Sequence, residues 1–284
     1  MKLTNKNIQI RINKYKNNKA KAVVSDEPIK GTRIRRKINP ILINLLHIKS
    51  KLMGLTYENI SNKSGNNEKT VIYAITHIGK FDYEMVVEAL GLCAYPFAGD
   101  WELMYATVDD YFLRTNGVLY IDTSDKEDRQ NSFKYMCKLL KQGTSMVIFP
   151  EGIWNLSPSL PVHRLFPGCV QAAKECNVPI VPIAVEQVEK HFIVNVGDEI
   201  DVNDIEEAEA VQKLRDTLAT LKWNIWEHIP HIRRSDIPPN YYEDLVDKRL
   251  SEFKGYTREV VNQRIFKTKA ERELAEIERD LKNI

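Results

Sequence analysis

Long apolar runs are missing from this chain of 284 residues. No stretch approaches the roughly 18–20 apolar residues that a membrane-spanning helix needs, and the N-terminus lacks the apolar core of a secretory signal peptide. The four cysteines are scattered without Cys-x-x-Cys spacing, which argues against a zinc site and fits reduced thiols in a cytosolic setting. The sequence therefore predicts a soluble or peripheral cytoplasmic protein.

Several motifs that define large enzyme classes are also absent. There is no Gly-x-Ser-x-Gly elbow, no Walker phosphate loop and no Gly-x-Gly-x-x-Gly, so serine hydrolase, nucleotidase and dinucleotide-dependent functions lack their basic parts. No motif requires a metal, and none indicates a bound cofactor. Residues 1–40 hold 12 Lys and Arg against 2 Asp and Glu, a net charge of +10. This basic segment carries only Tyr15 as an aromatic residue and no binding module, so we expect no nucleic-acid partner.

Strand and helix patterns alternate through the middle of the chain, which predicts an α/β fold with a mostly parallel sheet covered by helices. The predicted strands are Val71–Ile75, Tyr95–Ala98, Val118–Ile121, Ser145–Phe149 and Ile180–Val185. The predicted helices are Tyr83–Leu92, Asp128–Lys141 and Val170–Cys176, followed by Glu206–Ile229 and Glu259–Ile284. Residues 1–37 are polar, and their Ile8-Ile10-Ile12 alternation predicts either a short strand or disorder. Ligands of such folds gather at the carboxyl ends of the strands.

His77 lies at such a strand end, in the run Thr76-His77-Ile78-Gly79-Lys80-Phe81-Asp82. A turn through Gly79 would let Asp82, at the start of the next helix, reach the imidazole. A carboxylate on Nδ1–H fixes the tautomer that leaves Nε2 free to accept a proton, so the pair predicts a general base. The alternative is a strand-end His with an Asp that caps a helix. The same spacing recurs at His231 and Asp236, where two prolines follow and indicate a surface turn.

Two further strand ends carry informative residues. Phe149-Pro150-Glu151-Gly152 takes a strand directly into an acidic residue and a turn, where Glu151 either binds a ligand or belongs to a surface turn. Val178 to Ala184 is an apolar strand interrupted by Pro182. A proline inside a central strand needs a local reason, and a wall for an apolar ligand is one such reason.

Taken in order, these segments resemble the four blocks of the glycerol-phosphate and lysophosphatidate acyltransferase family. His77 to Asp82 matches the catalytic block, Gly117 to Thr123 resembles the second, Phe149 to Gly152 matches the third, and Val178 to Ala184 resembles the fourth. The similarity covers roughly residues 60–190. It divides the chain into a basic N-terminal segment (1–57), an acyltransferase core (58–200) and a C-terminal helical extension (201–284).

The resemblance implies that His77, held by Asp82, deprotonates a hydroxyl acceptor that attacks the thioester of acyl-CoA or acyl-carrier protein. It implies an acyl-binding role for Pro182 and an acceptor-binding role for residues of the second and third blocks. These acceptor residues are Gly117, Asp122, Thr123, Glu151, Gly152, Trp154 and Asn155. No cofactor is implied beyond the acyl donor, and the acceptor is expected to be a lysolipid.

Two positions depart from the family pattern. Members that act on phosphorylated glycerol usually carry Arg where this chain has Thr123, and Thr-Arg where it has Ile153-Trp154. Loss of two guanidinium groups removes a fork suited to phosphate, although Arg114, Lys126, Arg129 or Arg164 are candidates to replace it. Trp154 and Asn155 would instead suit a glycan or amine-bearing acceptor. The alternatives are therefore O- or N-acyl transfer to a non-phosphate acceptor, or a catalytically silent lipid-binding protein.

Residues 38–55 have apolar residues at helical spacing with Lys and Arg around them. Such a helix either packs on the domain or lies on an anionic membrane surface. Because substrates of the resembled family reside in bilayers, we expect peripheral attachment to the inner face of the membrane through this helix.

Overall fold

A computed structural model describes residues 5–65, 68–99, 108–115, 117–253 and 255–274. Its centre is a seven-stranded sheet with the order β1-β7-β6-β2-β5-β3-β4. The strands are β1 (Thr56–Asn59), β2 (Ile72–Ile75), β3 (Ala94–Ala98), β4 (Leu119–Tyr120), β5 (Ser145–Ile148), β6 (Ile180–Val188) and β7 (His191–Val196). All neighbours pair in parallel except β6 and β7, which form an antiparallel hairpin. The predicted mostly parallel sheet is confirmed, whereas β1 and β7 were not predicted.

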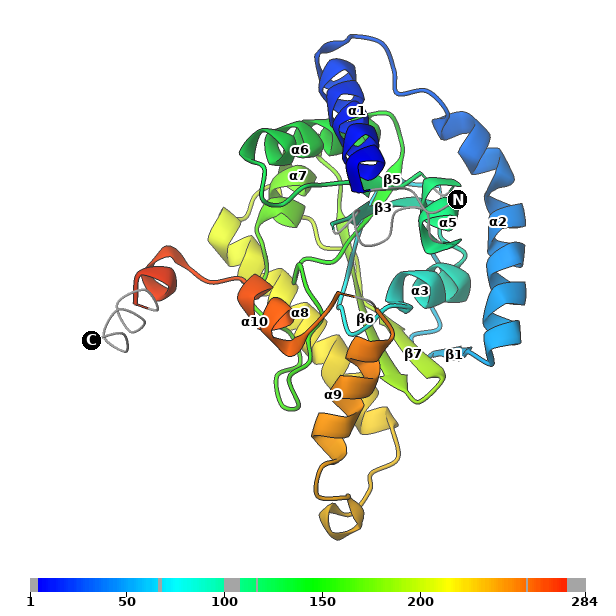
Figure 1. Cartoon of the computed structure of the whole chain (residues 1–284), viewed down its shortest axis with the longest axis vertical. Helices are drawn as coiled ribbons and strands as arrows, with labels where there is room; N and C mark the ends of the chain where they lie inside the picture. The colour runs from blue at the N-terminus through cyan, green and yellow to red at the C-terminus, as the bar shows by residue number, and fades with distance from the viewer. Residues whose placement is uncertain (1–4, 66–67, 100–107, 116, 254, 275–284) are drawn as a thin grey trace.

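Helices cover both faces of this sheet (Figure 1). They are α1 (Asn5–Val24), α2 (Thr32–Met53), α3 (Asp82–Leu90), α5 (Val108–Thr115), α6 (Lys126–Lys141), α7 (Gly168–Cys176), α8 (Glu207–His228), α9 (Tyr241–Ser251) and α10 (Arg258–Arg264). Alternate residues of β2 enter two different cores: Ile72 packs with α6, α7 and α8, and Tyr73 packs with α2 and α3. A strand buried on both faces reads as a continuous apolar run, which explains the pattern that predicted it.

The N-terminal segment is helical, so the prediction of a strand or disorder over residues 1–37 is wrong for its described part. Ile8, Ile12 and Tyr15 form one helical stripe that packs against Tyr120, and Ile10 is exposed on the other side. The alternating isoleucines therefore belong to a helix that packs on one side only. Residues 1–4 lie outside the described residues.

The C-terminal part also differs from expectation. The single predicted helix Glu259–Ile284 is interrupted, because α10 ends at Arg264 and residues 265–268 are not helical. Its last part, residues 275–284, lies outside the described residues. The helix α9 was not predicted. Among the described residues, no helix is both long enough and apolar enough to cross a membrane.

Candidate active site

His77 and Asp82 meet in the short connection between β2 and α3. His77 Nδ1 lies 2.9 Å from Asp82 Oδ2. The same Asp82 oxygen accepts the backbone N–H groups of Ile78 at 2.6 Å and Gly79 at 3.0 Å. Three donors on one fully buried carboxylate oxygen hold it firmly, and they fold the connection into the turn that the sequence predicted.

The imidazole of His77 stacks on Phe149 with ring centroids 4.2 Å apart, and its centroid lies 6.2 Å from that of Trp154 in a T-shaped arrangement. Its side chain remains 20% exposed. The hydrogen bond to Asp82 engages Nδ1, and among the described residues no group bonds to Nε2. Nε2 is therefore the ring nitrogen left without a protein partner, an arrangement that a general base would need.

Glu151 is fully buried behind His77 rather than on a surface turn. Its Oε1 accepts the backbone N–H of His77 at 3.0 Å, and its Oε2 accepts that of His163 at 2.8 Å. Burial raises the pKa of Glu151, and the two N–H groups oppose this by stabilising its charged form. The third block thus supports the backbone of the first, a contact between distant segments that spacing did not reveal.

The residues after Glu151 also hold the backbone of His77 in place. The Asn155 N–H donates to the carbonyl of His77 at 2.6 Å. The Asn155 side chain bonds within its own loop, since its Nδ2 donates to the Leu160 carbonyl and its Oδ1 accepts the Ser157 N–H. Gly152 has a φ of +72°, and a Cβ there would lie 2.6 Å from the ring of Phe166. Only glycine suits this backbone conformation and this space.

Trp154 is 3% exposed and lies under the C-terminal segment, against Phe253 and Tyr256. As a platform for a sugar or an amine it would first have to be uncovered. It contributes instead to a small apolar cluster with Ile153, Val246, Leu250 and Val261.

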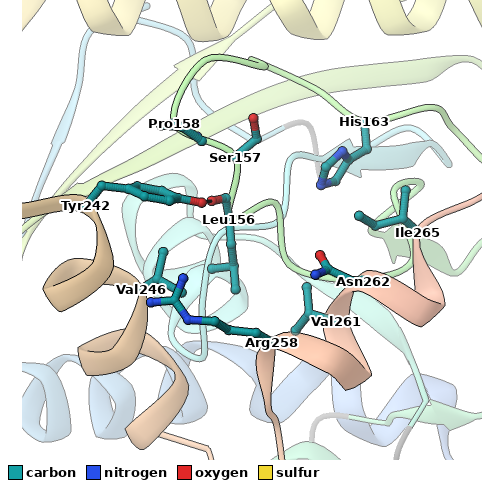
Figure 2. A pocket seen from close by; sticks show the side chains of 10 residues that line it. All are labelled: Leu156, Ser157, Pro158, His163, Tyr242, Val246, Arg258, Val261, Asn262 and Ile265. Carbon is teal, nitrogen blue, oxygen red and sulfur yellow. Dashed lines mark hydrogen bonds between the residues drawn. The ribbon is translucent and has the colours of Figure 1, made fainter. Parts of the chain in front are cut away.

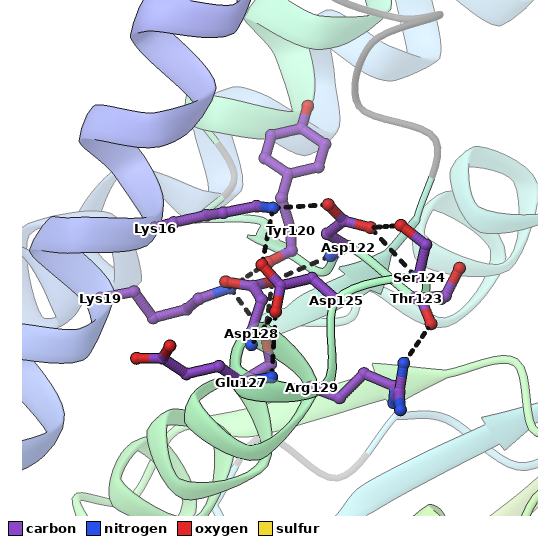
Figure 3. Close-up of polar contacts among 11 residues, drawn as sticks. Lys16, Lys19, Tyr120, Asp122, Thr123, Ser124, Asp125, Glu127, Asp128 and Arg129 are labelled. Carbon is purple, nitrogen blue, oxygen red and sulfur yellow. Dashed lines mark hydrogen bonds and ion pairs between the residues drawn. The ribbon is translucent and has the colours of Figure 1, made fainter.

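The second block lies further along the same edge of the sheet. β4 is three strands from β2, or about 14 Å at ~4.8 Å per strand. Gly117, with a φ of +82°, packs against the ring of Tyr95 before β4 begins. Asp122 follows β4 and pairs with Lys16 of α1 at 2.5 Å, as Figure 3 shows. Burial acts to raise the pKa of Asp122, but hydrogen bonds from Lys16 and Ser124 outweigh it and lower the pKa to about 2.

Thr123, the next residue, is exposed and its carbonyl accepts Arg129 Nη1 at 2.6 Å (Figure 3). A guanidinium therefore stands beside the position where the family usually carries Arg. Arg164, another candidate, pairs with Glu271 at 2.5 Å. Among these candidate cations, Arg129 is one that contacts the second block directly, through the Thr123 carbonyl.

Pro182 is buried in β6, next to β2. The ladder beside it is irregular, since Ile183 pairs with Val196 while Ile180 bridges to Ile200, one residue out of register. A proline is tolerated where a strand ladder is interrupted. A Cβ at Gly197 would lie 2.8 Å from Pro182 Cγ, so the ring packs directly on Gly197. Pro182 therefore has a packing role within the sheet, in addition to the acyl-binding role predicted for it.

A cavity of about 260 Å³ lies between the loop after Trp154 and the helices α9 and α10 (Figure 2). It is lined by Leu156, Ser157, Pro158, His163, Tyr242, Val246, Arg258, Val261, Asn262 and Ile265. Burial, together with the charge of Arg215, lowers the pKa of His163 and favours its neutral form. The His163 N–H bonded to Glu151 links this cavity wall to the support of His77.

The second His-x4-Asp pair is exposed, as predicted. His231 and Asp236 both lie on the surface, and Asp236 ends a short 3-10 turn, Arg234–Asp236, that precedes α9. No group of His, Cys, Asp and Glu among the described residues is arranged to hold a metal ion.

Comparison with known proteins places the site in a family. Residues 55–186, which include both His77 and Glu151, match the Acyltransferase family model. This segment is an acyltransferase domain. Over these residues the predicted resemblance to an acyltransferase is confirmed.

Solved structures show the same fold. The chain is similar to the crystal structure of the 1-acyl-sn-glycerophosphate (LPA) acyltransferase PlsC from Thermotoga maritima, with a TM-score of 0.57 and 11% sequence identity. The match covers 79% of this chain and 91% of the other. No curated protein matches this chain by sequence.

Proposed function

We propose that this acyltransferase moves an acyl group from the thioester of acyl-CoA or acyl-carrier protein to a hydroxyl of a lysophospholipid-like acceptor. His77 is the general base and Asp82 its partner. The observation that carries the proposal is the 2.9 Å contact between His77 Nδ1 and Asp82 Oδ2 inside an acyltransferase domain, with the imidazole partly exposed. The intact pair favours an enzyme over a silent lipid-binding protein.

The chemistry follows from this arrangement. His77 Nε2 takes the proton of the acceptor hydroxyl while the oxygen attacks the thioester carbonyl carbon. Asp82 stays ionised and stabilises the imidazolium that forms. The tetrahedral intermediate then collapses, the C–S bond breaks, and the thiolate takes the proton from Nε2. An ester and a free thiol leave, and His77 returns to its neutral form without a covalent enzyme intermediate.

The position of Arg129 favours an anionic acceptor. Its guanidinium lies at the exposed end of β4 beside Thr123, on the edge of the sheet that also carries His77. Guanidinium groups bind phosphate oxygens in a bidentate manner. The buried position of Trp154 removes the main argument for a glycan acceptor. A phosphate-bearing lysolipid is therefore favoured over the non-phosphate alternative.

The α2 helix supports attachment to a membrane. Its inner face buries Leu42 and Leu46, but a second apolar stripe points away from the domain. This outer stripe consists of Ile34, Ile41, Leu45, Ile48 and Leu52, each more than half exposed. Figure 1 shows α2 along one flank of the molecule. Exposed Arg33, Lys37 and Lys51 flank the stripe and suit an anionic lipid surface on the inner, cytoplasmic face.

An acceptor panel tests the proposal. Thiol release from acyl-CoA and from acyl-carrier protein is measured with lysophosphatidate, glycerol phosphate, monoacylglycerol, a glycan and a primary amine, and products are identified by mass spectrometry. We expect ester formation with lysophosphatidate, and a higher KM for this acceptor in Arg129→Ala. Transfer restricted to the amine or the glycan, or no transfer to any acceptor, would overturn the proposal.

A further inference from the structure

The last turn of α9 lies against the loop that carries His77. Arg249 Nη1 donates to the carbonyl of Ile78 at 3.4 Å, a long hydrogen bond. Its Nη2 donates to the carbonyl of Gln187 at 3.1 Å and to Glu186 Oε1 at 3.3 Å. The Arg249 side chain is only 11% exposed. One guanidinium thus joins the C-terminal helices, β6 and the catalytic loop.

The guanidinium is itself held in place. Glu186, its ion-pair partner, also contacts Lys222 of α8 at 3.0 Å and accepts Trp226 Nε1 at 2.9 Å. Burial acts to raise the pKa of Glu186, but the charges of Lys222 and Arg249 outweigh it and lower the pKa to about 2. Glu186 is therefore ionised at neutral pH, and its ion pair holds the Arg249 guanidinium in place.

The contact with Ile78 reaches the catalytic pair through one peptide group. The carbonyl of Ile78 and the N–H of Gly79 belong to the same planar unit. Arg249 lies at the carbonyl end of this unit, and Asp82 Oδ2 accepts its N–H end at 3.0 Å. A cation on the carbonyl polarises the peptide and strengthens the hydrogen bond that its N–H donates. The orientation of this peptide also sets the direction in which Asp82 faces His77.

We infer that Arg249 is a positioning residue for the His77–Asp82 pair, and that the C-terminal helices belong to the active site. The inference deepens the proposed function and rests on it for the role of His77. The cluster of Trp154 with Val246 and Leu250 also brings these helices near His77, because the ring centroids of Trp154 and His77 are 6.2 Å apart. The C-terminal extension therefore approaches the catalytic loop through two separate sets of residues.

A spectroscopic test needs no knowledge of the acceptor. The Nδ1 proton of His77 is followed by NMR in protein labelled with ¹⁵N-histidine, and the signal is assigned by its loss in His77→Ala. The variants are Arg249→Ala, Arg249→Lys and Lys248→Ala, the last a neighbouring exposed cation of the same helix. Arg249→Lys keeps a charge for Glu186 but offers one donor point in place of the fork.

We expect a hydrogen-bonded Nδ1 proton signal in the wild type and in Lys248→Ala, and an exchange-broadened or missing signal in both Arg249 variants. In the acyl-transfer assay kcat falls about 10- to 100-fold, because small displacements of catalytic groups have effects of this size. The KM for the acyl donor stays unchanged, and guanidinium ions added to Arg249→Ala restore part of kcat. Circular dichroism establishes that the variants are folded.

Different outcomes overturn the positioning role of Arg249 and the proposed acyl-transfer function. An Nδ1 signal in a folded Arg249 variant that equals the wild-type signal overturns the positioning role, whatever the enzyme acylates. A lost signal together with a wild-type kcat also overturns it. Absence of acyl transfer in the wild type, with the signal changes as expected, leaves the link between Arg249 and His77 supported and rejects the proposed function instead.

Discussion

Asp82 Oδ2 accepts three hydrogen bonds, one of them from His77 Nδ1 at 2.9 Å. Two backbone N–H groups fix the oxygen, so the imidazole is oriented by a carboxylate that cannot easily rotate away. Asp82→Asn keeps the size of the side chain but removes the charge that stabilises the imidazolium. We expect kcat to fall by about 10²-fold or more, with the KM for the acyl donor unchanged. Steady-state kinetics of thiol release checks this, and a wild-type kcat would contradict it.

Gly152 offers a test of the loop that supports His77. A Cβ there would meet the Phe166 ring at 2.6 Å, and the φ of +72° disfavours any side chain. Gly152→Ala should therefore lower the free energy of unfolding by about 1–3 kcal/mol. Gly168→Ala is the matched control, since a Cβ there meets nothing within 4 Å. Urea denaturation measures both variants, and equal midpoints would refute this explanation.

Lys19 of α1 is buried, and its ammonium lies 2.8 Å from Asp128 (Figure 3). It also donates to Ser132 Oγ at 2.7 Å. Lys19→Met leaves the Asp128 carboxylate buried without its cation, which costs about 3–5 kcal/mol. Lys21→Met, on the exposed side of the same helix, should change the unfolding free energy little. Chemical denaturation compares them. If Lys19→Met were as stable as Lys21→Met, α1 would not be held by this ion pair.

We expect the outer apolar stripe of α2 to bind the membrane surface. Leu45→Glu combined with Leu52→Glu places two carboxylates on this stripe without touching the buried face. We expect sedimentation with anionic liposomes to drop sharply, while the thermal unfolding temperature stays near that of the wild type. Leu274→Glu, an exposed leucine elsewhere, is the control. Equal sedimentation of all three proteins would remove the membrane role of α2.

Glu186 predicts an acid dependence of stability. Its pKa is lowered in the folded protein to about 2 from the ordinary 4.5, so its contribution is present above pH 4.5. That contribution is lost as the pH falls from 4.5 toward 2. Glu186→Gln should flatten this part of the curve of unfolding free energy against pH. An unchanged slope in the variant would show that the ion pairs with Lys222 and Arg249 are not formed in solution.

The sequence predicted the features that depend on local patterns. The runs at β2, β5 and β6 were found because both their faces are buried, and the turn at Gly79 because glycine and a helix start mark it. Features that depend on distant contacts were not found. Glu151 behind His77, Arg249 on Ile78 and Lys19 on Asp128 join segments more than 70 residues apart, and no spacing rule contains them.

Short amphipathic segments are a second kind of feature that the sequence alone does not predict. Ile8-Ile10-Ile12 fits a strand as well as a helix over so few residues, and only packing against Tyr120 decides between them. Trp154 is predicted from sequence as a ligand platform because it stands where the resembled family usually carries Arg after the third block. Its burial by Phe253 and Tyr256 depends on the C-terminal helices, whose placement the sequence does not reveal.

The central claim is that His77 Nε2 removes the proton of the acceptor hydroxyl. Its most direct test is thiol release from acyl-CoA with lysophosphatidate, compared between the wild type and His77→Ala. We predict a loss of at least about 10²-fold in kcat for His77→Ala, with the fold retained. Wild-type turnover by His77→Ala would contradict the account.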